Sequence, residues 1–253
     1  MCTQINQDLK AILFNILGGI IVAFLAWIYP MIIKLLKAKR FKKIFGKDSP
    51  DQISLIYGKM LLLPCFDERG QQRPFPYHKP GIADALYRVS SILSDTEASS
   101  IKYLSDAFSK NVNESPQMTC DEDVKDITDL SYISFGGLNN WKSISVLNSE
   151  ENIFYKFENS SIVSVEDKKE VYKITNSTDY AIIIKIRPKQ FPMRTHICVA
   201  GMGELGTRGA SYFLANKWKE ILKQTGDKQF GIIIKVSDNS DDSAQIVKVK
   251  IKK

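Results

Sequence analysis

The sequence predicts an α/β protein in which one N-terminal transmembrane helix is followed by a cytosolic domain with a mixed sheet. Three observations predict this class. Residues 11–33 contain no charged side chain. Residues 50–253 alternate apolar strand-like runs with segments of helical spacing, which is typical of α/β folds. Between residues 152 and 174, three short alternating runs predict a small antiparallel β excursion.

The first element is the apolar run AILFNILGGIIVAFLAWIYPMII at residues 11–33, which is 23 residues long. A helix needs roughly 20 apolar residues to cross the hydrocarbon core of a bilayer. A signal peptide would have a shorter apolar run, a basic start and a small-residue cleavage site. We therefore expect a transmembrane helix, preceded by a short extracytoplasmic N-terminus at residues 1–10.

The segment that follows, residues 34–49, contains seven of the lysines and arginines. Basic residues next to a membrane span stay on the cytoplasmic side. We therefore expect a basic juxtamembrane linker there, an N-terminus outside the cell and a cytoplasmic domain at residues 50–253. Residues 1–49 hold eight Lys and Arg and two Asp, so most of the net charge of +7 belongs to this part of the chain, and mainly to its basic segment at residues 34–49, the basic collar. The charge therefore indicates a membrane surface more than a nucleic-acid partner.

Small and polar residues recur on one face of the apolar run at Asn15, Gly19 and Ala23. Small residues let membrane helices approach closely, and an Asn can donate a hydrogen bond across the contact. We expect this face to be a membrane-helix interface in a homo-oligomer. A passive anchor with chance alanines is the alternative.

In the cytosolic part, apolar content and breaker residues predict the order of elements. We expect strands at 52–63, 130–137, 180–188, 195–201 and 230–238, and a charged edge strand at 244–253. Helices are expected at 82–93, 96–110, 138–149 and 206–224. Residues 65–81 are expected to form a long loop and residues 111–123 a break. The antiparallel excursion comprises residues 152–157, 161–165 and 170–174.

One glycine-rich turn, after the strand at 195–201, has the pattern G-x-G-x-x-G at Gly201, Gly203 and Gly206. Such glycines let the backbone approach a phosphate, and the amides of the following helix bind it. Thr207 adds a hydrogen-bonding group and Arg208 a positive charge. A dinucleotide site would also need an acidic residue about 20 positions further on, at the end of the next strand. Asp238 ends that strand but lies too far along. A phosphate cradle and a tight packing turn both remain open, and no cofactor is expected.

A second glycine-rich turn follows the strand at 130–137, with Gly136, Gly137, Asn139 and Asn140. Ligands of parallel α/β sheets bind at the carboxyl ends of the strands, so the two turns are expected to face one crevice. There the asparagines would contact a base or ribose. Simple capping of the following helix is the alternative.

Catalysis and metal binding have weaker signals. Glu204 lies inside the first glycine turn, which leaves open a membrane-tethered nucleotide-processing enzyme of the glycosidic-bond hydrolase kind. No second acid or histidine at suggestive spacing accompanies it. The cysteines and histidines lack metal-ligand spacing, so neither a metal site nor a catalytic residue is expected.

The membrane helix, the basic collar, and the two glycine turns at 132–140 and 197–207 together resemble bacterial anti-phage membrane effectors. The Hailong type is the most similar. The resemblance implies a Rossmann-like domain that reads a nucleotide or short oligonucleotide signal and controls an oligomeric pore, or ion channel, in the cell membrane. It also implies a homotetramer, silenced by a short oligodeoxyadenylate, in the bacterial inner membrane, and a signal-synthesising nucleotidyltransferase as partner.

Overall fold

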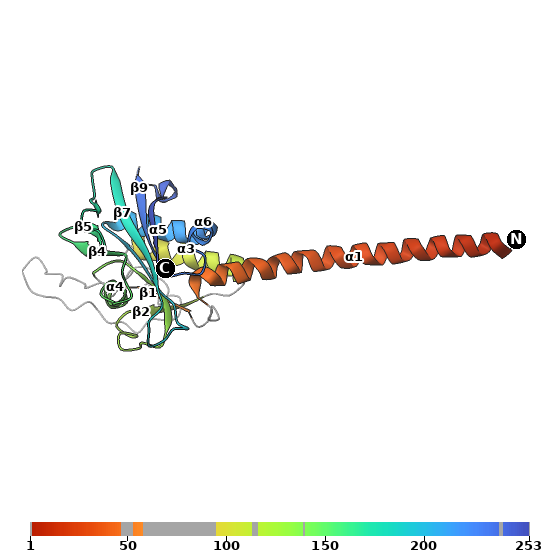
Figure 1. Cartoon of the computed structure of the whole chain (residues 1–253), viewed down its shortest axis with the longest axis horizontal. Helices are drawn as coiled ribbons and strands as arrows, with labels where there is room; N and C mark the ends of the chain where they lie inside the picture. Colours follow the sequence, from red (N-terminus) through yellow and green to blue (C-terminus); the bar gives the residue numbers. More distant parts are fainter. Residues whose placement is uncertain are drawn as a thin grey trace, which may run out of the picture.

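The computed structural model describes residues 2–46, 53–57, 95–112, 116–138, 140–237 and 240–252. Helix α1 (Cys2–Phe45) projects from an α/β domain as a long rod (Figure 1). Within the described residues, the stretch Gly19–Phe45 is long and apolar enough to cross a membrane, with a mean hydropathy of 2.1 over its most apolar 18 residues. Most large apolar side chains that the structure leaves exposed lie along this rod: Leu17, Ile20, Ile21, Val22, Phe24, Leu25, Trp27, Tyr29, Met31, Ile32, Ile33, Leu35 and Leu36.

The basic segment after the apolar run continues the same helix up to Phe45 instead of starting a linker. Phe41, Ile44 and Phe45 are at most 1% exposed and belong to the main core of the domain. Their i, i+3, i+4 spacing places them on one helical face, and the lysines between them stay outside. Residues 47–50 lie outside the described residues. Helix α1, the candidate membrane span, therefore enters the domain as one of its packed elements.

The main sheet has seven strands in the order β10-β9-β7-β8-β3-β1-β2. Strands β1 (Ile53–Tyr57), β2 (Gln117–Cys120), β3 (Ser131–Phe135) and β8 (His196–Gly201) run parallel to one another. The other half is antiparallel: β7 (Thr178–Ile186) pairs with β8 and β9 (Phe230–Ser237), and β10 (Gln245–Ile251) closes the edge. A separate small antiparallel sheet holds β4 (Tyr155–Glu158), β5 (Ser161–Ser164) and β6 (Val171–Tyr172).

The sheet separates two layers of core. Alternate residues of a strand point to opposite faces, so Ile183 and Ile182 of β7 lie in different clusters. On one face pack the end of α1, α3 (Asp95–Val112), α5 (Glu204–Asn216) and α6 (Trp218–Thr225). The other face is covered by α4 (Trp141–Leu147) and by β4 and β5 (Figure 1).

Most of the predicted elements are present, with two corrections. The expected break at 111–123 contains the edge strand β2, whose residues are exposed or half-buried and so lack an apolar signal. The expected helix at 206–224 is two helices, because Lys217 leaves helical geometry with φ −113° and ψ 21°. That break turns Trp218 onto Phe41, with ring centroids 5.3 Å apart. The expected helix at 82–93 and loop at 65–81 lie outside the described residues.

Candidate functional site

The two glycine turns lie side by side at one edge of the sheet. Strands β3 and β8 are parallel neighbours, with Phe135 opposite Val199, so their carboxyl ends meet at the same edge. The Gly136 amide donates to the Val199 carbonyl at 3.0 Å, which joins the turn after β3 to strand β8. The two turns therefore meet at one edge of the sheet, while a shared ligand crevice between them stays a prediction.

In the turn after β8, an internal carboxylate occupies the amides that a phosphate would use. Asp179, only 3% exposed at the start of β7, accepts the Gly206 amide at 2.7 Å and the Gly203 amide at 3.1 Å. Its Oδ1 also accepts its neighbour Tyr180 N–H at 2.7 Å. A helix N-terminus favours an anion there because its first amides have no partner within the helix. Burial raises the pKa of the Asp179 carboxyl, and the amide hydrogen bonds oppose that rise.

The glycines of this turn are required by close packing. A Cβ at Gly201 would lie 2.2 Å from the Thr207 nitrogen, and one at Gly206 would lie 2.9 Å from the Asp179 carboxylate. Thr207 points inward, and its hydroxyl oxygen accepts the Gly201 amide at 2.8 Å. In the described structure, therefore, the backbone of this turn contacts its own chain at each of these positions.

The two charged residues of the turn face other groups. Arg208 donates from Nε to Asp241 at 2.7 Å, which ties α5 to the short 3-10 helix η2 (Asp241–Ser243). Glu204 is exposed in the first turn of α5. The helix macrodipole favours an acidic side chain at this position, so a glutamate there needs no catalytic explanation.

The turn after β3 is organised by Asn140, which is 1% exposed. Its Oδ1 caps α4 by accepting the amides of Lys142 and Ser143, and its Nδ2 donates to the carbonyls of Ile56 and Phe135. All four bonds are internal, so Asn140 acts as a cap and a strand tie. Gly136 has a φ of +81° with open space where a Cβ would be, and Gly137 packs near Phe157. Asn139 lies outside the described residues.

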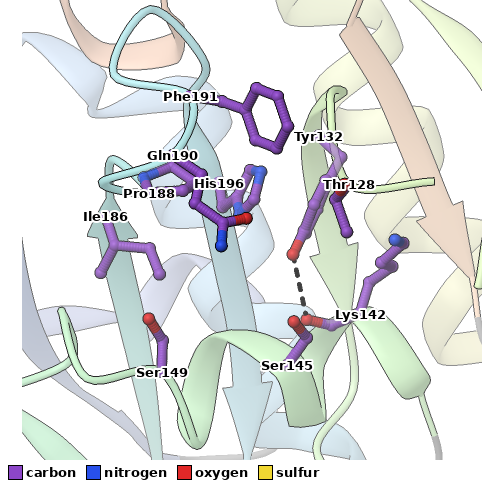
Figure 2. A pocket seen from close by; sticks show the side chains of 10 residues that line it. All are labelled: Thr128, Tyr132, Lys142, Ser145, Ser149, Ile186, Pro188, Gln190, Phe191 and His196. Carbon is purple, nitrogen blue, oxygen red and sulfur yellow. Dashed lines mark hydrogen bonds between the residues drawn. The ribbon is translucent and has the colours of Figure 1, made fainter. Parts of the chain in front are cut away.

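A pocket of about 130 Å³ lies at the opposite edge of the sheet, beneath α4. It is formed where β3 and β8 begin and β7 ends. Figure 2 shows side chains from these strands and from α4 arranged around one space, with the Phe191 ring above it. The lining residues are Thr128, Tyr132, Lys142, Ser145, Ser149, Ile186, Pro188, Gln190, Phe191 and His196.

His196 is the residue of this pocket that sequence reasoning missed. It is 8% exposed and stacks on Tyr132, with ring centroids 4.2 Å apart. Its imidazole hydrogen-bonds to the backbone of Leu130, while Nε2 has no partner among the described residues. A buried acceptor without a donor costs about 1–3 kcal/mol. Burial lowers the pKa of His196 to about 4, so the ring is neutral at pH 7.

The predicted membrane-helix face is open in the single chain. Apart from the backbone of its own helix, no described atom lies within 4 Å of a Cβ built at Gly19, and Ala23 is exposed. The Asn15 side chain lies outside the described residues. This face therefore stays a prediction.

No family model, curated protein or solved structure matches this chain.

Proposed function

We propose that this protein is a single-pass membrane effector whose α/β domain controls its membrane helix in response to a nucleotide or short oligonucleotide. The role in anti-phage defence, the Rossmann-like character of the domain, the tetramer and the nucleotidyltransferase partner follow from the resemblance to Hailong-type effectors. The observation that carries the proposal is the junction between helix and domain.

Three kinds of contact fix the end of α1. Phe41 stacks on Phe45 at 4.3 Å between ring centroids and meets Phe108 edge-on at 5.0 Å. The buried ammonium of Lys185 donates to the Lys43 carbonyl at 2.5 Å, where the negative end of the helix dipole favours a cation. Gly46, with a φ of +118°, ends the helix and donates to the Lys42 carbonyl at 2.9 Å.

These contacts make the membrane helix continuous with the core of the domain. A tether would need only a flexible linker, whereas a helix packed into the core moves when the core moves. Since one helix cannot enclose a pore, the membrane output requires several chains. We propose that the Asn15, Gly19 and Ala23 face joins them, because small residues permit close helix contact. The basic collar places the domain on the cytoplasmic side in this proposal.

The turn after β8 constrains how a nucleotide would bind. Its phosphate reaches the Gly203 and Gly206 amides only if the Asp179 carboxylate leaves them. Ligand binding at this turn would therefore displace the start of β7, the strand that carries Lys185 at its other end. This gives the signal a route from the glycine turns to the end of α1.

The test separates oligonucleotide binding from its effect on the membrane by interrupting helix α1. Two glycines inserted between Lys39 and Arg40 interrupt α1 outside the domain core. The control carries the same insertion between Asn159 and Ser160, an exposed turn of the β4–β5 hairpin. Each protein is reconstituted into dye-loaded vesicles of phosphatidylethanolamine and phosphatidylglycerol, and leakage is measured with and without a short oligodeoxyadenylate.

We expect the oligonucleotide to change dye leakage at least severalfold for the wild type and for the hairpin insertion. The protein with the α1 insertion should still bind the oligonucleotide but show no change in leakage. An equal response of all three proteins would show that the junction transmits nothing. Absence of binding to the wild type would exclude the oligonucleotide as the signal.

A further inference from the structure

The pocket beneath α4 offers a hydrogen-bond acceptor that the described protein leaves unused. The imidazole of His196 interacts with the Leu130 backbone through one nitrogen, and Nε2 is the buried nitrogen without a partner. A neutral imidazole with a proton on Nδ1 carries a lone pair on Nε2. Among the described residues, therefore, no donor satisfies this acceptor.

The other groups that face His196 are engaged or uncharged. Lys142 directs its ammonium to the carbonyls of Ile127 and Lys125, at 2.5 Å and 3.2 Å. The Tyr132 hydroxyl donates to the Lys142 carbonyl at 3.4 Å, as Figure 2 shows. Burial raises the pKa of Tyr132, so this hydroxyl stays protonated. Lys142, the charged residue among the lining residues, already has two carbonyl partners, and burial lowers the pKa of its ammonium.

The size and lining of the pocket set the class of ligand. Its volume of about 130 Å³ is close to that of a cavity of about 150 Å³ known to hold benzene. Ile186, Pro188 and Phe191 supply apolar surface, whereas Gln190 and Ser145 supply polar groups. We propose that this pocket binds an uncharged molecule about the size of one six-membered ring, which donates an O–H or N–H hydrogen bond to His196 Nε2.

The pocket and the end of α1 lie back to back across two strands. On β7, Lys185 reaches the Lys43 carbonyl of α1 and the next residue, Ile186, lines the pocket. On the β8 side, Thr195 lies against Gly46 and the next residue, His196, lines the pocket. Neighbouring residues of a strand face opposite sides of the sheet. A ligand on His196 therefore stabilises the same backbone segments that hold α1.

Occupancy of the pocket does not depend on the function proposed above, whereas its influence on α1 rests on that function. The experiment reads the two separately. The full chain, in bilayers of phosphatidylethanolamine and phosphatidylglycerol, is labelled with ¹⁵N-histidine. Because the sequence contains only His78 and His196, His196→Phe assigns the signals. Phenol is the probe, and benzene is the control of the same shape without a donor.

We expect phenol to shift the Nε2 resonance of His196 saturably and leave His78 unchanged, and benzene to leave Nε2 unshifted. One neutral hydrogen bond corresponds to a roughly fivefold to tenfold difference in affinity between the two molecules. An unshifted Nε2 at high phenol concentration, or equal shifts with both molecules, would overturn the site. So would a free protein in which Nε2 carries the proton.

The second measurement is amide hydrogen exchange at the end of α1, residues 42–46, with and without phenol. We expect saturation with phenol to slow this exchange at least twofold in the wild type and to leave it unchanged in His196→Phe. If phenol binds but exchange at 42–46 is unaltered, the site stands and its coupling to α1 is rejected.

Discussion

The two edges of the main sheet differ in where their polar groups find partners. At the carboxyl ends of β3 and β8, the glycine turns are satisfied from within: Asp179 takes the amides of one turn and Asn140 organises the other. At the opposite edge, His196 keeps an unused acceptor beside a pocket, next to residues that hold α1. The comparison teaches that a glycine motif can mark close backbone approach without a ligand, while the buried group without a described partner, His196, is the place where we propose one.

The largest effect expected from this comparison concerns the glycines. Gly201→Ala places a Cβ 2.2 Å from the Thr207 backbone nitrogen, and we expect it to destabilise the domain by about 3 kcal/mol or more. Gly136→Ala places its Cβ where no described atom lies within 4 Å, so its cost in unfolding free energy, about 1–2 kcal/mol, comes only from the positive φ. Denaturant unfolding of the full chain measures both. Equal losses in the free energy of unfolding would show that the two turns have equal room for a Cβ, and would contradict this prediction.

Asp179→Ala tests whether the turn after β8 is an anion site filled by its own chain. The amides of Gly203, Gly206 and Tyr180 lose an acceptor, so we expect a loss of about 2–4 kcal/mol. Inorganic phosphate should restore part of the thermal stability of this variant and leave the wild type unchanged. Asp179→Asn, which retains an amide oxygen, serves as the control with a smaller loss. If phosphate stabilises the wild type equally, the carboxylate does not block the turn.

The free energy of unfolding should depend on pH through His196, which lies at the opposite edge of the sheet. Its folded pKa of about 4 lies below the ordinary value of 6.5, so between these values the unfolded chain binds more protons. Stability then falls as the pH is lowered from about 6.5 toward 4, by about 2 kcal/mol at pH 5. Subtracting the unfolding profile of His196→Phe removes the contributions of Asp179 and other acids. Superimposable profiles would show that His196 is not buried as a neutral ring.

The positions of the strands along the chain could be predicted from the sequence where both faces of a strand are buried. The runs at Ile182–Ile184 and Ile232–Ile234 are apolar without interruption because each residue enters one of the two core layers. The edge strand β2 has no such run. The i, i+3, i+4 pattern of Phe41, Ile44 and Phe45 was present among the lysines and would have revealed the packed end of α1.

The candidate sites were less accessible because they depend on pairing between distant segments. Asp179 reaches Gly203 because β7 runs antiparallel to β8, and sequence spacing alone does not fix that direction. A lone acid at the start of an otherwise apolar strand was the available signal. His196 meets Tyr132 through the register of β3 with β8, and nothing in the local sequence announces that contact.

The central claim is that α1 and the domain form one rigid unit, and the width of a distance distribution tests it most directly. Nitroxide labels at Lys34 on α1 and Lys228 on the domain, in bilayers, report the distance between rod and core by electron paramagnetic resonance. A reference pair at Lys102 and Lys223 lies within the domain. We predict a single distribution about as narrow as that of the reference pair. A distribution several times broader would show that a flexible linker joins helix and domain, and would contradict the account.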